Sequence, residues 1–158
     1  MLEAYRKTTV EHWDEAWEAG IRMRLPCGLD VGMRNLMRLL RRHVHHGMSV
    51  LEIGFAPGKL LGWTASILRT DVSGLDYSST GIRTAKELFK RLGLDGDLRC
   101  EDVFNTTFKS GSFDLVCSFG LIEHFDDPRE IVRRHVHLAK PGGVILITVP
   151  SYGGIYGR

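Results

Sequence analysis

Hydrophobic residues follow two patterns along the chain, helical spacing and continuous short runs, and the two patterns alternate. Helical spacing predicts helices over residues 30–46 and 58–69, a third ending at Gly93 and a fourth beginning at Asp127. Continuous apolar runs predict short strands at 49–54, 72–77, 97–103, 113–119 and 144–149. Apolar strands that alternate with helices are typical of a parallel sheet covered on both faces. We therefore predict an α/β fold with a Rossmann-like, doubly wound, mostly parallel sheet.

The same spacing predicts which side chains form the core. One face of the third helix carries Ile82, Ala85, Phe89 and Leu92, and one face of the fourth carries Ile131, Val132, Val136 and Ala139. We then expect His135 and His137 to be structural or to face solvent. Cys100 and Cys117 fall within apolar strand runs, and we expect both to be buried, reduced thiols.

The composition is that of one ordinary globular domain. The chain has 158 residues, of which 43% are hydrophobic and 25% charged, and its apolar runs are too short to span a membrane. The N-terminus lacks the basic-then-apolar order of a secretory signal, and the three cysteines lack metal-ligand spacing. These features predict a cytoplasmic protein without a membrane partner.

The net charge of +2 is too small to argue for a nucleic-acid partner. Basic residues do concentrate at 22–24 and at 41–46. Cations at a helix end that are stabilised by the helix dipole and solvated by water are the simplest explanation. A patch that binds RNA or phosphate, or a metal site, is the alternative.

The stretch VLEIGFAPG, starting at residue 50, carries the clearest chemical signal. It contains an apolar strand with Glu52 and a tight turn with Gly54, Ala56 and Gly58 that opens a helix. Such a turn directs backbone N–H groups toward a crevice, and a Cβ at either glycine would hinder a ligand lying against the backbone. Lys59 breaks the dinucleotide spacing Gly-x-Gly-x-x-Gly. The spacing acid-x-Gly-x-Gly-x-Gly is met, with Ala56 in place of the middle glycine, and resembles the cofactor loop of class I S-adenosylmethionine-dependent methyltransferases.

Two acids follow the next strands where such a sheet can hold a nucleoside. Asp76 ends the second strand, and its carboxylate can accept from both hydroxyls of a ribose. Helix capping is the competing role, which the serines that follow can also fill. Tyr77 is placed either to pack on the adenine or to join the core. Asp102 ends the third strand and, with the N–H of Val103, is placed to read the adenine edge.

The segments VLEIGFAPG, SGLDYS, RCEDV, FDLVCSFGLIEHF and KPGGVILITVP together resemble, in order, the motifs of a small-molecule class I S-adenosylmethionine-dependent methyltransferase. The resemblance implies transfer of a methyl group to an oxygen or nitrogen of a small molecule. It also implies S-adenosyl-L-methionine as cofactor, held by Glu52, Gly54, Ala56, Gly58, Asp76, Tyr77, Asp102, Val103 and Phe119. The opening HWDEAW resembles the N-terminal helix that lies over the cofactor in such enzymes. Its Trp13 and Trp17 are placed to close the site or to anchor that helix.

An oxygen acceptor of high pKa needs a base, and His124 is the candidate because imidazole titrates near neutral pH. Local capping, or a bridge from Glu123 or His124 to Arg129, is the alternative role. Related O-methyltransferases with a similar Glu-His step use acidic neighbours to hold a divalent metal. Residues 118–120 are Ser-Phe-Gly and offer no carboxylate, so we expect no metal, although Asp126 and Asp127 keep a metal site as the alternative.

Relatives of this type usually continue past the fifth strand with a helix and two more strands, whereas this sequence ends soon after Pro150. We therefore expect residues 1–47 to form a helical segment over the cofactor site. Residues 48–158 are expected to form a Rossmann-like core that lacks the last two of the usual seven strands. The fifth strand then becomes an open sheet edge, which predicts a homodimer or another cover.

Three other functions compete with a small-molecule methyltransferase. A module that binds S-adenosylmethionine without turnover fits the incomplete acceptor half. An RNA methyltransferase is suggested by the Ala-Pro-Gly turn and the basic helix end. It is less favoured because Ser118 and Phe119 stand where that group carries an aspartate. An NAD-dependent dehydrogenase is least favoured, because Lys59 breaks its fingerprint.

Overall fold

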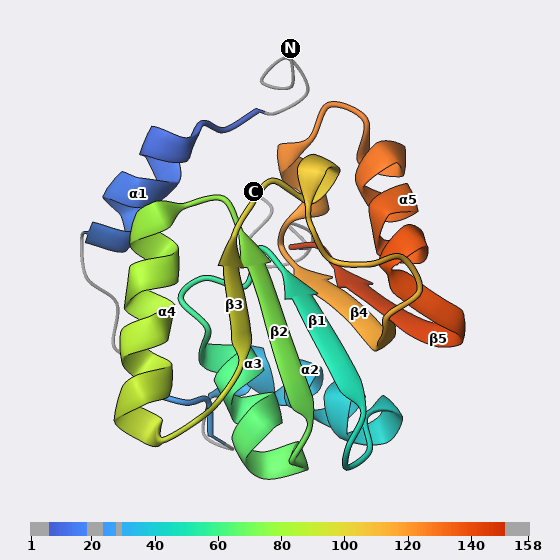
Figure 1. Ribbon diagram of the computed structural model, residues 1–158. Coiled ribbons are helices and arrows are strands. Elements are labelled where there is room, and N and C mark those ends of the chain that lie inside the picture. The colour runs from blue at the N-terminus through green and yellow to red at the C-terminus, as the bar shows by residue number, and fades with distance from the viewer. Residues whose placement is uncertain (1–6, 19–23, 28–29, 151–158) are drawn as a thin grey trace.

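The computed structural model describes residues 7–18, 24–27 and 30–150 (Figure 1). Its helices are α1 (Val10–Glu18), α2 (Val31–His43), α3 (Lys59–Trp63), α4 (Ser79–Leu92) and α5 (Pro128–Leu138). Its strands are β1 (Ser49–Ile53), β2 (Asp71–Asp76), β3 (Asp97–Cys100), β4 (Phe113–Phe119) and β5 (Ala139–Thr148). A π-helical turn, Thr64–Leu68, extends α3. Among these ranges no helix has the length and apolar character needed to cross a membrane.

The strands form one parallel sheet in the order β3-β2-β1-β4-β5. This arrangement confirms the predicted Rossmann-like α/β fold. The chain runs outward from β1 through β2 to β3, and then returns to the other side of β1 for β4 and β5. Parallel strands leave a crevice at their carboxyl ends where the direction of winding reverses. In this sheet the reversal lies between β1 and β4.

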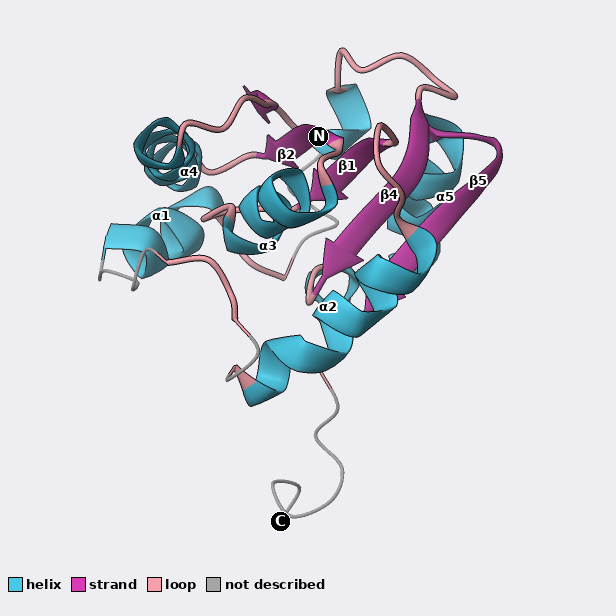
Figure 2. Cartoon of the chain, turned by 90° about the horizontal axis from the view of Figure 1, so that it is seen from below, coloured by secondary structure: helices cyan, strands magenta, loops and turns pink. Residues whose placement is uncertain are grey.

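Side chains alternate between two cores on the two faces of the sheet. On one face Val50 and Leu115 pack with residues of α2, α3 and α4. On the other face Leu51 and Val116 pack with α5 and with the loop that follows β3. Figure 2 shows α2 and α3 on one side of the sheet and α5 on the other. A period of two along buried strands thus serves two separate helical layers.

Val136 and Leu92, which we expected in the core, are exposed to solvent. Val136 is 57% exposed, while His135 is fully buried together with Ile131 and Leu138. The imidazole can occupy the core because its two nitrogens lie 2.8 Å from the Ile131 carbonyl oxygen and 2.9 Å from Ser118 Oγ. The inward face of α5 is therefore set by a polar ring whose hydrogen bonds are satisfied. In α4, similarly, Leu92 is 39% exposed because it lies in the last turn of the helix.

The third strand is shorter than expected, since β3 ends at Cys100 rather than near Val103. The Asp102 carboxylate accepts from the N–H of Phe104, 3.0 Å away, and so begins a 3-10 turn that cannot continue the strand. Cys100 is exposed on this edge strand, against expectation, whereas Cys117 is buried as expected. A strand at the sheet edge has a neighbour on one side only, which leaves part of its side chains in solvent.

Candidate functional site

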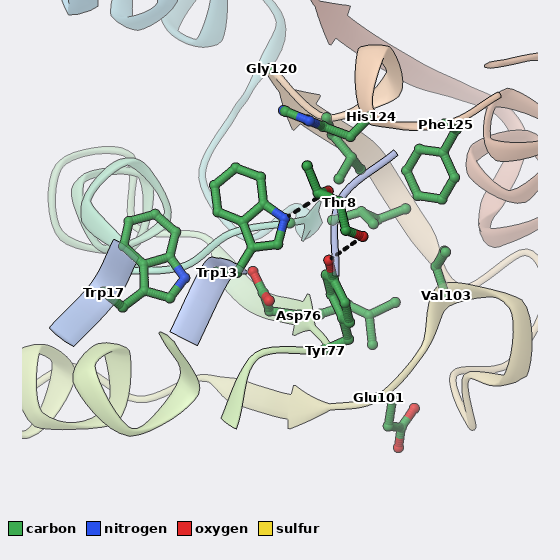
Figure 3. A pocket seen from close by; sticks show the side chains of 14 residues that line it. Thr8, Trp13, Trp17, Asp76, Tyr77, Glu101, Val103, Gly120, His124 and Phe125 are labelled. Carbon is green, nitrogen blue, oxygen red and sulfur yellow. Dashed lines mark hydrogen bonds between the residues drawn. The ribbon is translucent and has the colours of Figure 1, made fainter. Parts of the chain in front are cut away.

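A pocket opens at the carboxyl ends of the strands, where the sheet order reverses. Its volume is about 620 Å³, including the part that is open to solvent. The lining residues come from the N-terminal segment and from the ends of the first four strands: Thr8, Trp13, Trp17, Ile53, Gly54, Leu75, Asp76, Tyr77, Glu101, Val103, Gly120, Leu121, His124 and Phe125. Figure 3 shows their side chains around the cavity. Five of the predicted site residues meet here, namely Gly54, Asp76, Tyr77, Val103 and His124.

Asp76 is the buried acid of this pocket, with only 8% of its surface exposed. Its carboxylate accepts from the N–H of Ser78 at 2.9 Å and from the N–H of Ala56 at 3.1 Å. Burial raises the pKa of Asp76, and the backbone N–H groups oppose that rise. The helix cap is Ser78, whose hydroxyl accepts from the N–H of Gly81. Asp76 is therefore not needed as the cap of α4.

The other predicted cofactor residues do not line the pocket. Glu52 is buried within β1, and burial raises its pKa well above the ordinary value. Ala56 donates its N–H to Asp76. Asp102 caps the 3-10 turn, and Phe119 packs against the core on the α3 side.

The two glycines of the turn have different surroundings. Gly58 has φ +82°, and a Cβ there would lie 3.2 Å from the Cβ of Ala85 in α4. It therefore preserves helix packing rather than space for a ligand. Gly54 does line the pocket, with φ +71°, and a Cβ there would lie 2.9 Å from Leu121 Cδ1. Both positions require left-handed backbone, which glycine adopts without strain.

The segment from Lys7 to the end of α1 lies beside the pocket and is tied to it by hydrogen bonds. Lys7 donates its N–H to the His124 carbonyl oxygen at 2.9 Å, and the Tyr77 hydroxyl donates to the Thr9 carbonyl oxygen at 3.3 Å. The Asp14 carboxylate accepts from the Ser78 hydroxyl at 2.5 Å. None of the described residues of α1 is fully buried. These hydrogen bonds attach α1 and the residues before it to the edge of the pocket.

Two indole rings and one imidazole form an aromatic wall. Trp13 stacks on Trp17 with ring centroids 5.8 Å apart, and its edge contact with His124 has a centroid distance of 5.1 Å. The N–H of Trp13 donates to Thr8 Oγ1 at 3.0 Å. Aromatic faces of this kind suit a flat or cationic ligand. Both predicted roles of the tryptophans, closing the site and anchoring α1, are consistent with these contacts.

Glu101 and Phe125 line the pocket but were not among the predicted site residues. Glu101 directly precedes Asp102, so the run RCEDV contained the acid without showing which of the two faces the cavity. Burial raises the pKa of Glu101, but hydrogen bonds from Thr107 and Thr106 outweigh it and leave the pKa lowered. Phe125 gave no signal in the sequence beyond its place after the Glu-His step. Across the described ranges, no group of three or more His, Cys, Asp and Glu side chains is arranged to hold a metal ion.

A parallel sheet with a glycine turn, a buried acid and a crevice at its winding reversal is the arrangement in which Rossmann-like proteins bind nucleotide-type ligands. Residues 51–147 match the family described as Methyltransferase domain. The chain belongs to this methyltransferase family, which confirms its resemblance to class I S-adenosylmethionine-dependent methyltransferases.

Several relatives of known name are similar to this chain. Phosphoethanolamine N-methyltransferase 2 of Caenorhabditis elegans is 30% identical over 98% of this chain and 34% of its own length. A ubiquinone biosynthesis O-methyltransferase of Coxiella burnetii is 29% identical over 65% of this chain and 43% of its own length. The chain thus spans about one third to less than half of these relatives.

Solved structures agree with this assignment. Phosphoethanolamine N-methyltransferase 2 of Haemonchus contortus, in complex with phosphomonomethylethanolamine and S-adenosylhomocysteine, is 28% identical, with a TM-score of 0.69. The match covers 89% of this chain and 33% of that one. A protein from Methanococcus maripaludis, 20% identical with a TM-score of 0.69 over 91% of this chain and 64% of that one, shares the fold.

Proposed function

We propose that this chain is the cofactor-binding and catalytic part of an S-adenosylmethionine-dependent methyltransferase that acts on an oxygen or nitrogen of a small molecule. The observation that carries the proposal is the buried Asp76 carboxylate in a pocket beside the Gly54 turn. Family membership supports it, as do relatives named as N- and O-methyltransferases. Because these relatives are named for transfer to nitrogen and to oxygen, the proposal includes both acceptor atoms.

The pocket residues fit the proposed cofactor. The Asp76 carboxylate receives backbone N–H groups, among them those of Ala56 and Ser78. A carboxylate has about four acceptor sites, so it can still accept from a ribose hydroxyl. Leu75, Val103 and Leu121 supply apolar lining for a flat base. When bound, S-adenosylmethionine supplies a methyl group on a positively charged sulfur. The hydroxyl of Tyr77 donates to the carbonyl oxygen of Thr9 and so keeps the N-terminal segment beside the pocket.

His124 is the residue that we assign as the base. It lines the pocket, its carbonyl oxygen is held by the N–H of Lys7, and its ring rests against the edge of Trp13. In this proposal a ring nitrogen of His124 accepts the proton that the acceptor oxygen or nitrogen loses. The surrounding aromatic side chains exclude water from the reacting atoms.

Calorimetric titration with S-adenosylhomocysteine, with NADH as the control, tests the cofactor assignment. We expect the first ligand alone to bind. Asp76→Asn should weaken that binding at least tenfold, because an ionised acceptor is replaced by a neutral amide. Equal binding of both ligands, or unchanged affinity in the variant, would overturn the assignment.

Transfer from S-adenosylmethionine to a panel of small amines and phenols tests the catalytic role. His124→Gln should slow transfer by about 10²- to 10⁴-fold while affinity for S-adenosylhomocysteine stays the same. Loss of binding in this variant would contradict the role as base. Binding by the wild-type chain without transfer to any panel member would instead favour the module without turnover.

We also propose that the free edge of β5 pairs with a second copy of the chain. Among the described strands β5 pairs only with β4, and Ile145 and Val149 are 36% and 54% exposed. An unpaired apolar edge favours association with another strand. Sedimentation velocity should then give a dimer, and Ile145→Lys should shift it to monomer. A wild-type monomer at high protein concentration would refute this pairing.

A further inference from the structure

The indole N–H of Trp17 is buried without a hydrogen-bond partner among the described residues. Trp17 nevertheless lines the pocket, one helical turn from Trp13, whose own N–H donates to Thr8 Oγ1. Buried donors are almost always paired, because leaving one unpaired loses its hydrogen bond to water. A ligand bound in this pocket is therefore a candidate for the missing partner of the Trp17 N–H.

The surroundings of this N–H identify the part of the pocket concerned. A Cβ added at Gly81 would lie 2.9 Å from Trp17 Nε1 and 2.6 Å from the Cβ of Ala56. Gly81 belongs to the first turn of α4, and Ala56 donates its N–H to Asp76. Trp17 Nε1 thus lies between the turn after β1 and the start of α4. In Figure 3 its nitrogen is on the side of the ring that faces Asp76.

The hydrogen-bonding capacities of Asp76 and Trp17 restrict which ligand groups can bind between them. Asp76 can only accept hydrogen bonds when ionised, and the Trp17 indole can only donate. A group that satisfies both must donate to a carboxylate and accept from an indole. A hydroxyl does both, and a vicinal diol can give its protons to the carboxylate while one of its oxygens accepts from the indole. An ammonium or guanidinium group lacks the acceptor, and a second ionised carboxylate lacks the donor.

The position of Trp17 is set by its helix. Asp14, on the same helix, accepts from the Ser78 hydroxyl and from the N–H of Thr80, 3.2 Å away. These two bonds hold α1 against the first turn of α4. The side chain of Trp17 is only partly buried, so a ligand bound against the indole ring would bury more of its surface.

We propose that Trp17 Nε1 donates a hydrogen bond to a ribose hydroxyl oxygen of the cofactor while Asp76 accepts the hydroxyl protons. This inference rests on the proposed function, because S-adenosylmethionine supplies the ribose. Trp17 is then a residue that selects for the ribose diol and links α1 to the nucleoside half of the cofactor.

Calorimetry on Trp17→Phe tests the bond, with Trp13→Phe as the matched control. The ligands are S-adenosylhomocysteine and its analogue without the 2′ and 3′ hydroxyls. Trp17→Phe should weaken S-adenosylhomocysteine binding about three- to tenfold, the effect of one lost hydrogen bond, and should not weaken binding of the analogue. Any loss in Trp13→Phe should be equal for both ligands, because its N–H already has a protein partner.

The outcomes separate this inference from the proposed function. If the wild-type chain binds neither ligand, the proposed function fails. If it binds S-adenosylhomocysteine and Trp17→Phe binds equally well, or is weakened equally for both ligands, the ribose bond is wrong. Should Trp17→Phe not fold, the indole N–H resonance of Trp17 in the wild-type chain decides. It should shift with S-adenosylhomocysteine and not with the analogue, and the same shift with both would overturn the inference.

Discussion

The buried His135 predicts how the stability of this fold depends on pH. Its Nδ1 faces the Ile131 carbonyl oxygen, which can only accept, so Nδ1 carries the proton. Its Nε2 then accepts from the Ser118 hydroxyl, and the ring is neutral. Burial lowers the pKa of His135, although the bond to Ile131 opposes this shift. The same contact joins α5 to the end of β4, from which the loop carrying His124 leaves.

The sign of the effect follows from proton binding. An unfolded histidine titrates near pH 6.5, and the folded pKa of His135 lies lower, so the unfolded chain takes up this proton first as the pH falls. The contribution to stability is complete above about pH 6.5 and declines below it until the folded pKa is reached. Within that window the contribution falls by about 1.4 kcal/mol for each pH unit.

His135→Gln keeps a polar side chain but removes the titration. Urea unfolding followed by circular dichroism, between about pH 5 and pH 8, measures both chains. Near neutral pH we expect the variant to be less stable by about 1–3 kcal/mol, because buried partners lose their hydrogen bonds. That difference should shrink as the pH falls below about 6.5. Other titrating groups, such as Glu52, are present in both chains and cancel. A difference that stays constant over this range would refute the neutral, buried imidazole.

Two further changes can be measured by the same unfolding assay. Burial raises the pKa of Glu52, so its carboxyl group stabilises the folded state at low pH and this contribution is lost as the pH rises above about 4.5. Glu52→Gln should therefore raise stability near pH 8, and an unchanged or lower unfolding midpoint would contradict this. Gly54→Ala should cost about 2–3 kcal/mol, since it adds a contact with Leu121 to the strain of positive φ. The control Gly47→Ala has a similar φ of +78° and open space, so it should cost about 1 kcal/mol, and equal losses would refute the steric argument.

Parts of the site could be read from the sequence because they depend on short stretches of chain. Gly54 belongs to a turn of a few residues, and Asp76 ends a short apolar run that predicts a strand. Trp17 could be placed on a helix face but not paired, because its partners come from α4 and from the turn after β1. Glu101 could not be distinguished from Asp102, since the length of β3 decides which acid reaches the pocket.

The sequence alone determined the helices, the strands, the parallel sheet and the glycine turn, because these follow from local conformational preference and from the spacing of apolar side chains. Tertiary structure decided which residues meet. The inward place of His135 depends on Ser118 in a different element, and the pocket depends on β1 lying between β2 and β4. Hydrogen bonds and contacts between distant segments lower the free energy only when strand pairing brings them together. For this reason they leave no periodic signal in the sequence.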